Sequence, residues 1–148
     1  ELFSLCKKHQ IHTCLDTSGC ILNDEVLDLL NVTDMVLLDI KFSDKELYHL
    51  HTKADMDTVM HFLAVLEKRN IRTWIRHVLV PDLNDSTEQL LRLKGMLQGY
   101  TCIEKVEFLP FRKLCEEKYQ TLQLEFPFAK YREGNREDIE RANRIFTC

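Results

Sequence analysis

Charged side chains gather at the ends of the segments that read as buried strands. The apolar run MVLLDIK finishes on Asp39 and Lys41, which alternate on one strand face with Leu37. The stretch HTCLDTSG places Asp16 at the end of an earlier short run, and TWIRHVLVP places Arg76 inside a later one. Carboxylates and cations on one face need a ligand, water or each other as partners. The pattern therefore indicates either a binding site or a structural set of ion pairs.

Four such runs alternate with segments in which apolar residues recur at helical spacing. Strands are expected at about residues 12–17, 35–41, 73–81 and 104–111, and helices at about 1–9, 24–31, 56–69, 86–99 and from 135 onward. Strands that alternate with helices pair in parallel through right-handed crossovers. The predicted fold class is α/β, as an open doubly wound sheet or an arc of a barrel. Residues 1–148 are expected to form a single domain.

Parallel strands of this kind place their ligands at the carboxyl ends. The fourth run closes with LPFR, so Arg112 joins the charged groups expected at that edge. The structural alternative is that Asp39 pairs with Lys41 or Arg76 and has no further role. His77 alternates with Arg76, which predicts a packed histidine on the helix-facing side rather than a base.

Two segments carry no clear periodic signal. The polar stretch between the second strand and Met56 includes His49 and His51, which are expected to lie in a solvated loop. Residues 112–134 are mixed in character and have no period.

Composition excludes several classes of function. The chain is 45% hydrophobic and 30% charged, which is typical of a soluble globular protein. Its net charge of -4 gives no general attraction to nucleic acid or to an anionic membrane surface. No apolar stretch reaches the length of a membrane span and no signal peptide opens the chain, which favours a cytoplasmic location.

Cysteine spacing gives no sign of a metal site. The six cysteines stand far apart, at Cys6, Cys14, Cys20, Cys102, Cys115 and Cys148. They form no CxxC and no close cluster, so free thiols in a reducing compartment are expected. The chain begins at Glu1 without a methionine and runs directly into a helical pattern, as a piece of a longer protein would.

Taken together, the stretches CKKHQIHTCLDTSG, VTDMVLLDIK, TWIRHVLVP and VEFLPF resemble the pyruvate formate-lyase activating enzymes in order and spacing. These radical S-adenosylmethionine oxidoreductases use S-adenosylmethionine and a [4Fe-4S] cluster to install a glycyl radical on a partner enzyme. The resemblance runs from Glu1 to at least Leu124. It implies that the chain forms the C-terminal four strand–helix units of a partial, TIM-like (β/α)6 barrel.

The resemblance also implies roles for individual residues. The family's Asp-Leu-Lys contacts S-adenosylmethionine, so Asp39, Ile40 and Lys41 inherit cofactor binding. Arg112 stands where the family's LPYH motif has a histidine that contacts the same cofactor. The arginine of the family's WIR motif lies toward the substrate, which assigns a substrate-side position to Arg76. No residue of this chain inherits a catalytic role.

A monovalent cation is a further implication of the resemblance. In the family, the aspartate of the LDT motif and the strand-end aspartate are associated with such a cation. Asp16, Thr17, Leu37 and Asp39 are the residues that inherit this site.

The family's cluster-binding CxxxCxxC and its GGE motif do not occur in these 148 residues. The resemblance therefore implies a parent protein that carries them, with this chain inactive alone. Pyruvate formate-lyase or a related glycyl radical enzyme is the implied partner, and flavodoxin or ferredoxin the implied electron donor. One alternative is a truncated, non-catalytic binding module for a glycyl radical enzyme. Another is a small α/β protein that binds phosphate, although the chain has four glycines and no glycine-rich loop.

Overall fold

The computed structural model describes residues 1–147, and Cys148, one of the expected free thiols, lies outside the described residues. Contacts within the chain form two compact units, one of residues 1–77 and 97–107, the other of residues 78–96 and 108 onward. Each unit is described by itself. The expectation of a single domain across the chain stays a prediction. Between residues 1 and 147, no helix is both long and apolar enough to cross a bilayer.

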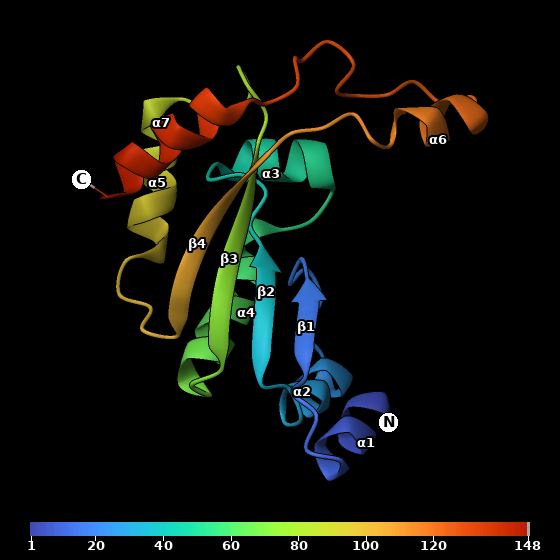
Figure 1. Cartoon of the computed structure of the whole chain (residues 1–148), viewed down its shortest axis with the longest axis vertical. Helices are drawn as coiled ribbons and strands as arrows, with labels where there is room; N and C mark the ends of the chain where they lie inside the picture. The colour runs from blue at the N-terminus through green and yellow to red at the C-terminus, as the bar shows by residue number, and fades with distance from the viewer. Residues whose placement is uncertain (148) are drawn as a thin grey trace. The chain divides into compact units, whose positions relative to one another are not determined.

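Four strands form one sheet in the order β1-β2-β3-β4 (Figure 1). They are β1 Cys14–Thr17, β2 Met35–Asp39, β3 Arg72–Leu79 and β4 Ile103–Pro110. The register of β1, β2 and β3 is parallel, with Asp16 opposite Leu37 and Asp39 opposite Arg76. The prediction of a parallel α/β fold is confirmed, and all four strands lie where the sequence predicts them.

One helix precedes the first strand, and the others connect the strands or follow the last one. They are α1 Leu2–Lys8, α2 Asp24–Leu30, α3 Lys45–Thr52, α4 Met56–Lys68, α5 Thr87–Leu97, α6 Glu116–Thr121 and α7 Arg136–Thr147. The Asn23 side chain caps α2 by accepting from the Val26 amide at 3.0 Å. Ser86 and Gln89 exchange the hydrogen bonds of a capping box at the start of α5.

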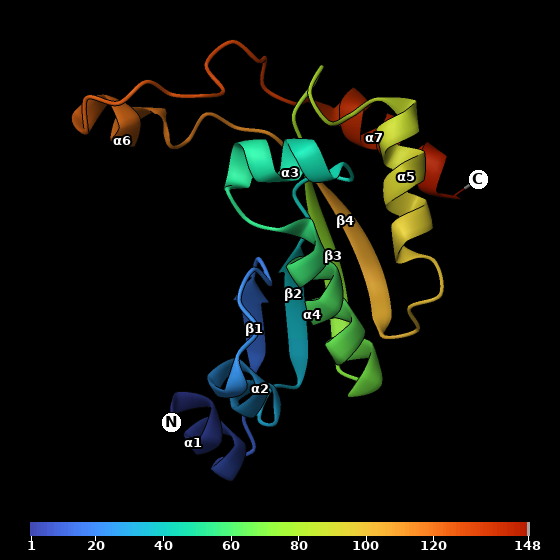
Figure 2. The same cartoon turned by 180° about the vertical axis from the view of Figure 1, so that it is seen from behind.

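In the first unit, α4 lies behind β2 and β3 in Figure 1 and in front of them in Figure 2. Its buried residues are Met56, Val59, Phe62, Leu63 and Leu66. Burial alternates along the strands, because every second residue of β2 and β3 points to this helix. Leu38 and Ile75 are fully buried there, whereas Leu37, Asp39 and Arg76 on the other face keep contact with solvent.

The prediction of a solvated loop between the second strand and Met56 is wrong, because helix α3 occupies much of this segment. The Asp44 side chain caps this helix by accepting from the amides of Glu46 and Leu47, each at 3.0 Å. Tyr48 is buried and lies edge-on to Phe42, and His51 stacks on the same ring. The N-cap and the buried face of this segment stabilise a helix rather than a loop.

In the second unit, a core of Val80, Phe111 and Phe126 holds the segment that follows β4. This segment leaves the strand end at Arg112 and returns at Gly134, whose amide donates to the Phe111 carbonyl at 3.0 Å. The short helix α6 lies within it, in a stretch whose sequence shows no clear period. The two ends of the segment are therefore fixed to each other by backbone contact.

Gly134 has no room for a side chain. A Cβ atom there would lie 3.0 Å from the Phe111 nitrogen and 3.1 Å from the Pro110 Cα, and both are backbone atoms. We expect Gly134→Ala to lower the free energy of unfolding by about 1–3 kcal/mol through overpacking. Gly95 in α5 is the matched control, because nothing lies within 4 Å of its Cβ position. Gly95→Ala should raise stability by about 0.5–1 kcal/mol, and denaturant unfolding of both variants measures the two effects. If both substitutions changed the free energy of unfolding equally, the close approach of the backbone to Gly134 would be contradicted.

Asp138 at the start of α7 makes the unit sensitive to acid. Its carboxylate accepts from both Arg132 Nη atoms, at 2.7 and 2.8 Å, and from the Asn135 amide at 2.8 Å. The hydrogen bonds from Arg132 contribute most to lowering the pKa of Asp138 from 3.8 to about 2. Because the folded-state pKa lies below the unfolded one, this stabilisation is complete above pH ~4 and is lost as the pH falls toward ~2.

Asp138→Asn should therefore reduce the free energy of unfolding by about 1–2 kcal/mol at neutral pH, and the difference from wild type should shrink as the pH falls from ~4 to ~2. Denaturant titration across this range measures it. Glu140→Gln on the same helix is the control, since its partner Arg136 is 91% exposed and the pair should contribute less than ~0.5 kcal/mol. A wild-type difference that stays constant with pH would argue against an ionised Asp138.

Candidate functional site

Four charged side chains meet in the first unit, near the carboxyl ends of β1 and β2 and at the middle of β3. Arg76 Nε donates to Asp39 Oδ1 at 2.7 Å, and Arg76 Nη2 donates to Asp16 Oδ1 at 2.5 Å. Lys41 Nζ donates to Asp39 Oδ2 at 2.6 Å. The structure thus brings together Asp16, Asp39, Lys41 and Arg76, as expected from alternation along parallel strands. The roles assigned to them stay predictions.

Strand register explains this meeting. Asp39 is the direct neighbour of Arg76 across the β2–β3 pair, so the two side chains leave the sheet side by side on one face. Asp16 is opposite Leu37, one pleat before Asp39 on the same face, which is within reach of a long arginine side chain.

The two ion pairs of Arg76 differ in how far their side chains are exposed to solvent. The side chains of Asp39 and Arg76 are 19% and 20% exposed, whereas that of Asp16 is 59% exposed. Solvent screens an exposed ion pair, so the Arg76–Asp39 pair contributes more to local order than the Arg76–Asp16 pair. Lys41, at 36% exposure, presents its ammonium at the solvent side of Asp39.

The charge state of Arg76 is fixed by these contacts. Partial burial by itself lowers the pKa of the Arg76 guanidinium. Hydrogen bonds to Asp39 and then to Asp16 outweigh that effect, so the pKa of Arg76 is raised. The guanidinium is therefore a permanent cation between two carboxylates.

Ile40 and His77 lie on the closed face and hold the strand end in place. The Ile40 side chain is fully buried, and its amide donates to the Arg76 carbonyl at 3.0 Å. The Ile40 carbonyl accepts from His77 Nδ1 at 2.6 Å, which fixes the proton on that nitrogen. The expectation of a packed histidine is confirmed. The predicted cofactor contact of Ile40 stays a prediction.

Sequence reasoning missed Tyr48 as a support of this strand end. Its ring is buried next to Phe42, which directly follows Lys41, and its hydroxyl is hydrogen bonded to the Lys41 backbone. Burial raises the pKa of Tyr48 to about 12, so the hydroxyl stays protonated. The signal was present in the sequence, because Asp44 is a strong N-cap and Leu47, Tyr48 and His51 follow at helical spacing.

The turn after β1 positions Thr17. Gly19 has a φ of +65°, and a Cβ there would lie 2.8 Å from a methyl group of Leu38, so glycine is required at this position. The Gly19 amide donates to Thr17 Oγ1 at 3.1 Å. Leu37 shares the face of the charged cluster, whereas Thr17 is opposite Leu38 and its side chain leaves the other face of the sheet. The predicted cation site that includes both residues stays a prediction.

Arg112 belongs to the second unit, where it holds together the two ends of the segment between β4 and α7. Arg112 Nη1 donates to the Gly134 carbonyl at 3.1 Å and approaches Glu133 Oε2 at 3.4 Å. The Lys113 amide donates to Glu133 Oε1 at 2.8 Å, and this bond is the main cause of the lowered pKa of Glu133.

Thiols form no cluster in the part of the chain that the structure describes. Cys6, Cys14, Cys20, Cys102 and Cys115 are free, as expected. Burial raises the pKa of Cys102 to about 11, which makes it a packed and unreactive thiol. Within residues 1–147, no group of three or more His, Cys, Asp or Glu side chains could hold a metal ion.

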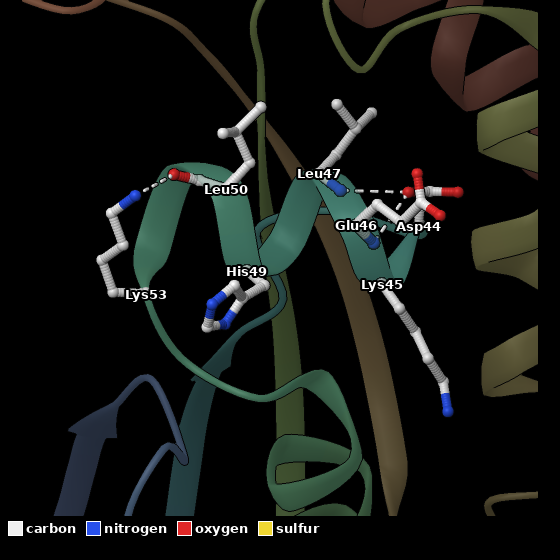
Figure 3. A pocket seen from close by; sticks show the side chains of 7 residues that line it. All are labelled: Asp44, Lys45, Glu46, Leu47, His49, Leu50 and Lys53. Carbon is white, nitrogen blue, oxygen red and sulfur yellow. Dashed lines mark hydrogen bonds between the residues drawn. The ribbon is translucent and has the colours of Figure 1, made fainter.

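Two surface hollows lie away from the charged cluster. One, of about 640 Å³, surrounds α3 and is lined by Asp44, Lys45, Glu46, Leu47, His49, Leu50 and Lys53 (Figure 3). In Figure 3 Leu47 and Leu50 point to one side of α3 while Lys45 and His49 point to the other, so the lining side chains do not converge on one ligand position. The other, of about 650 Å³, lies at the amino ends of β2 and β3, around Asp34 and Arg69. In parallel α/β folds that end serves stability rather than function.

Comparison with known proteins agrees with this arrangement. Residues 1–93 match the family model of the Radical SAM superfamily. The chain is 34% identical over 147 residues to the pyruvate formate-lyase 1-activating enzyme of Escherichia coli strain K12, covering 98% of this chain and 60% of that protein. It is 35% identical over 145 residues to the pyruvate formate-lyase-activating enzyme of Clostridium pasteurianum, covering 98% and 59%. The chain therefore spans about 60% of the length of these relatives.

Solved structures share the fold. A domain of the pyruvate-formate lyase-activating enzyme from Bacteroides vulgatus superposes with a TM-score of 0.79 at 15% identity, over 99% of this chain and 81% of that one. Streptococcus suis SuiB bound to S-adenosylmethionine superposes with a TM-score of 0.74 at 15% identity, over 99% and 32%. The fold thus matches a partial radical SAM barrel. With the family match over more than half of its residues, the chain belongs to the radical SAM superfamily and is related to the pyruvate formate-lyase activating enzymes.

Proposed function

We propose that this chain is the S-adenosylmethionine-holding part of a glycyl radical enzyme activase. The observation that carries the proposal is the cluster of Asp16, Asp39, Lys41 and Arg76, which forms near the carboxyl ends of β1 and β2 with Arg76 reaching it from β3. S-adenosylmethionine is a sulfonium amino acid with both charges of a zwitterion, and a site with paired carboxylates and cations complements such a ligand.

Asp39 and Lys41 are the residues that would hold the cofactor. The Lys41 ammonium donates to Asp39 on the open face of the sheet, and an anionic or hydroxyl oxygen of a ligand can exchange with that contact. The Asp39 carboxylate has further lone pairs beyond its contacts to Arg76 and Lys41. Both side chains lie on the open face of the sheet, where a ligand can reach them.

The parent protein would supply what these residues lack. When bound, S-adenosylmethionine and a [4Fe-4S] cluster supply the radical chemistry of this superfamily, and the cluster ligands must come from outside the 148 residues. The barrel residues of this chain position the cofactor and exclude water from it. Pyruvate formate-lyase or a related glycyl radical enzyme is the proposed partner, with flavodoxin or ferredoxin as electron donor.

Arg112 is proposed as a further cofactor contact, in place of the family's histidine. Its Nη1 atom is engaged by Gly134 and Glu133, which fixes the side chain and leaves other guanidinium N–H groups to donate to a ligand. Arginine stacks on aromatic rings and stays charged, so it suits an adenine or carboxylate contact as a cation.

Lys41→Met tests the proposal directly in the full-length protein, made from its natural reading frame. We expect the variant to bind S-adenosylmethionine at least about tenfold more weakly by calorimetry, a loss of ~1.4 kcal/mol, because the ammonium contact is gone. With the reconstituted cluster, a reductant and pyruvate formate-lyase, wild type should give a glycyl radical signal by electron paramagnetic resonance, and the variant a weak one.

Lys45→Met is the matched control. Lys45 also pairs with an aspartate, Asp57 at 2.7 Å, but on an exposed helix surface of the same unit. It should keep wild-type affinity within about twofold. Cofactor binding without any radical on the partner would favour the alternative of a non-catalytic binding module. No cofactor binding by wild type would refute the proposed function.

Arg112→Ala separates a cofactor contact from a structural one. We expect about threefold to tenfold weaker binding of S-adenosylmethionine, with Arg112→His restoring most of the affinity. Arg136→Ala, at a highly exposed arginine of the same unit, should have no effect on binding. If Arg112→Ala binds the cofactor as well as wild type, Arg112 only holds the ends of its segment together through Gly134 and does not contact the cofactor.

A further inference from the structure

The position that the family resemblance assigns to a monovalent cation is taken by a side chain. Arg76 uses two nitrogens of its guanidinium, Nε and Nη2, to bind one oxygen each of Asp39 and Asp16. The guanidinium thus lies between the two carboxylates that would have to ligate the cation. A cation and Arg76 would compete for the same Oδ1 atoms.

The negative charges of the two carboxylates are already balanced by two positive side chains, so neutrality requires no further cation. Asp16 and Asp39 carry two negative charges, and Arg76 and Lys41 carry two positive charges. A further positive ion would be repelled by two cations within hydrogen-bond distance of its ligands. The positive charge of Arg76 is permanent, because its hydrogen bonds to Asp39 and Asp16 raise the pKa of the guanidinium.

The other proposed ligands do not compensate. Thr17 is opposite Leu38, so its side chain leaves the other face of the sheet from that of Asp16, and Leu37 has an apolar side chain. The residues that the structure describes contain no third carboxylate, histidine or cysteine to complete a metal-binding group with Asp16 and Asp39. Beyond the two carboxylates that Arg76 occupies, no side-chain oxygen of these residues therefore adds to the shell that a hard cation requires.

We infer that the Arg76 guanidinium replaces the monovalent cation at this site, so that the folded protein has no specific requirement for Na⁺ or K⁺ there. Arg76 is then a positioning residue that holds Asp39 toward its ligand, in addition to any contact with substrate. The part of this inference that concerns cofactor affinity rests on the proposed function. The part that concerns cation binding by the protein alone does not.

The test compares salts at constant ionic strength of about 0.15 M, namely KCl, NaCl and choline chloride, on the full-length protein. The first readout is the thermal midpoint of the protein without S-adenosylmethionine, and the second is the affinity for S-adenosylmethionine. Wild type should give the same midpoint in all three salts and the same affinity within about twofold. A midpoint or an affinity that is clearly higher in KCl or NaCl than in choline chloride overturns the inference.

Arg76→Ala should create the dependence that wild type lacks. With the guanidinium gone, two like-charged carboxylates face each other and a small cation can bind between them. We expect its thermal midpoint to rise by a few degrees in KCl or NaCl relative to choline chloride, since ligands of the native state stabilise it. An equal midpoint in the three salts overturns the inference, because Arg76 would then fill no cation site.

Arg72→Ala is the matched control. Arg72 lies on the same strand and also binds a carboxylate with two nitrogens, at 2.5 and 3.0 Å, but both bonds go to Glu104. Its removal leaves one exposed carboxylate and should produce no cation dependence. If Arg76→Ala does not fold, the wild-type comparison decides alone. If wild type binds no S-adenosylmethionine, the proposed function fails while the thermal midpoints still test the inference.

Discussion

The guanidinium of Arg76 connects three strands, and the candidate site depends on that connection. It starts on β3, meets its direct neighbour Asp39 on β2 and extends to Asp16 on β1. This is possible in one register only. A slip of β3 by one residue would turn Arg76 toward α4 and bring His77 to the open face, since side chains alternate with a period of two. The charged cluster is therefore a consequence of the strand register.

The register itself is set by the closed face of the sheet. Leu38 and Ile75 are fully buried there, and His77 uses its Nδ1 proton to fix the Ile40 carbonyl. Gly19 allows the turn after β1 to approach Leu38 closely. Apolar packing on one face thus determines where ionic groups lie on the other, and the polar face needs no strong interactions of its own to stay ordered.

Much of this could be predicted from the sequence, because strand alternation is a local property. Period-two patterns gave the four strands and the side of Asp39, Lys41 and Arg76. Helix α3 was missed because its polar surface dominates its composition, while a single buried ring, Tyr48, ties it to the core. The ion-pair partners of Asp39 could not be predicted from the sequence either. Whether Asp39 pairs with Lys41 or with Arg76 depends on register and exposure, and the structure shows that it pairs with both.

A structural ion-pair set and a ligand site are therefore not exclusive readings of these residues. The Arg76–Asp39 pair is largely shielded from water, so opening it would leave a buried charge without a partner, which is costly. Asp16 and Lys41 are much more exposed, and water can replace their contacts at little cost. A ligand that enters the open face would exchange with Lys41 and Asp16 and leave Arg76–Asp39 intact. The same four residues would then divide into the fixed Arg76–Asp39 pair, which presents the Asp39 carboxylate to the ligand, and the more exposed Lys41 and Asp16, whose contacts the ligand exchanges.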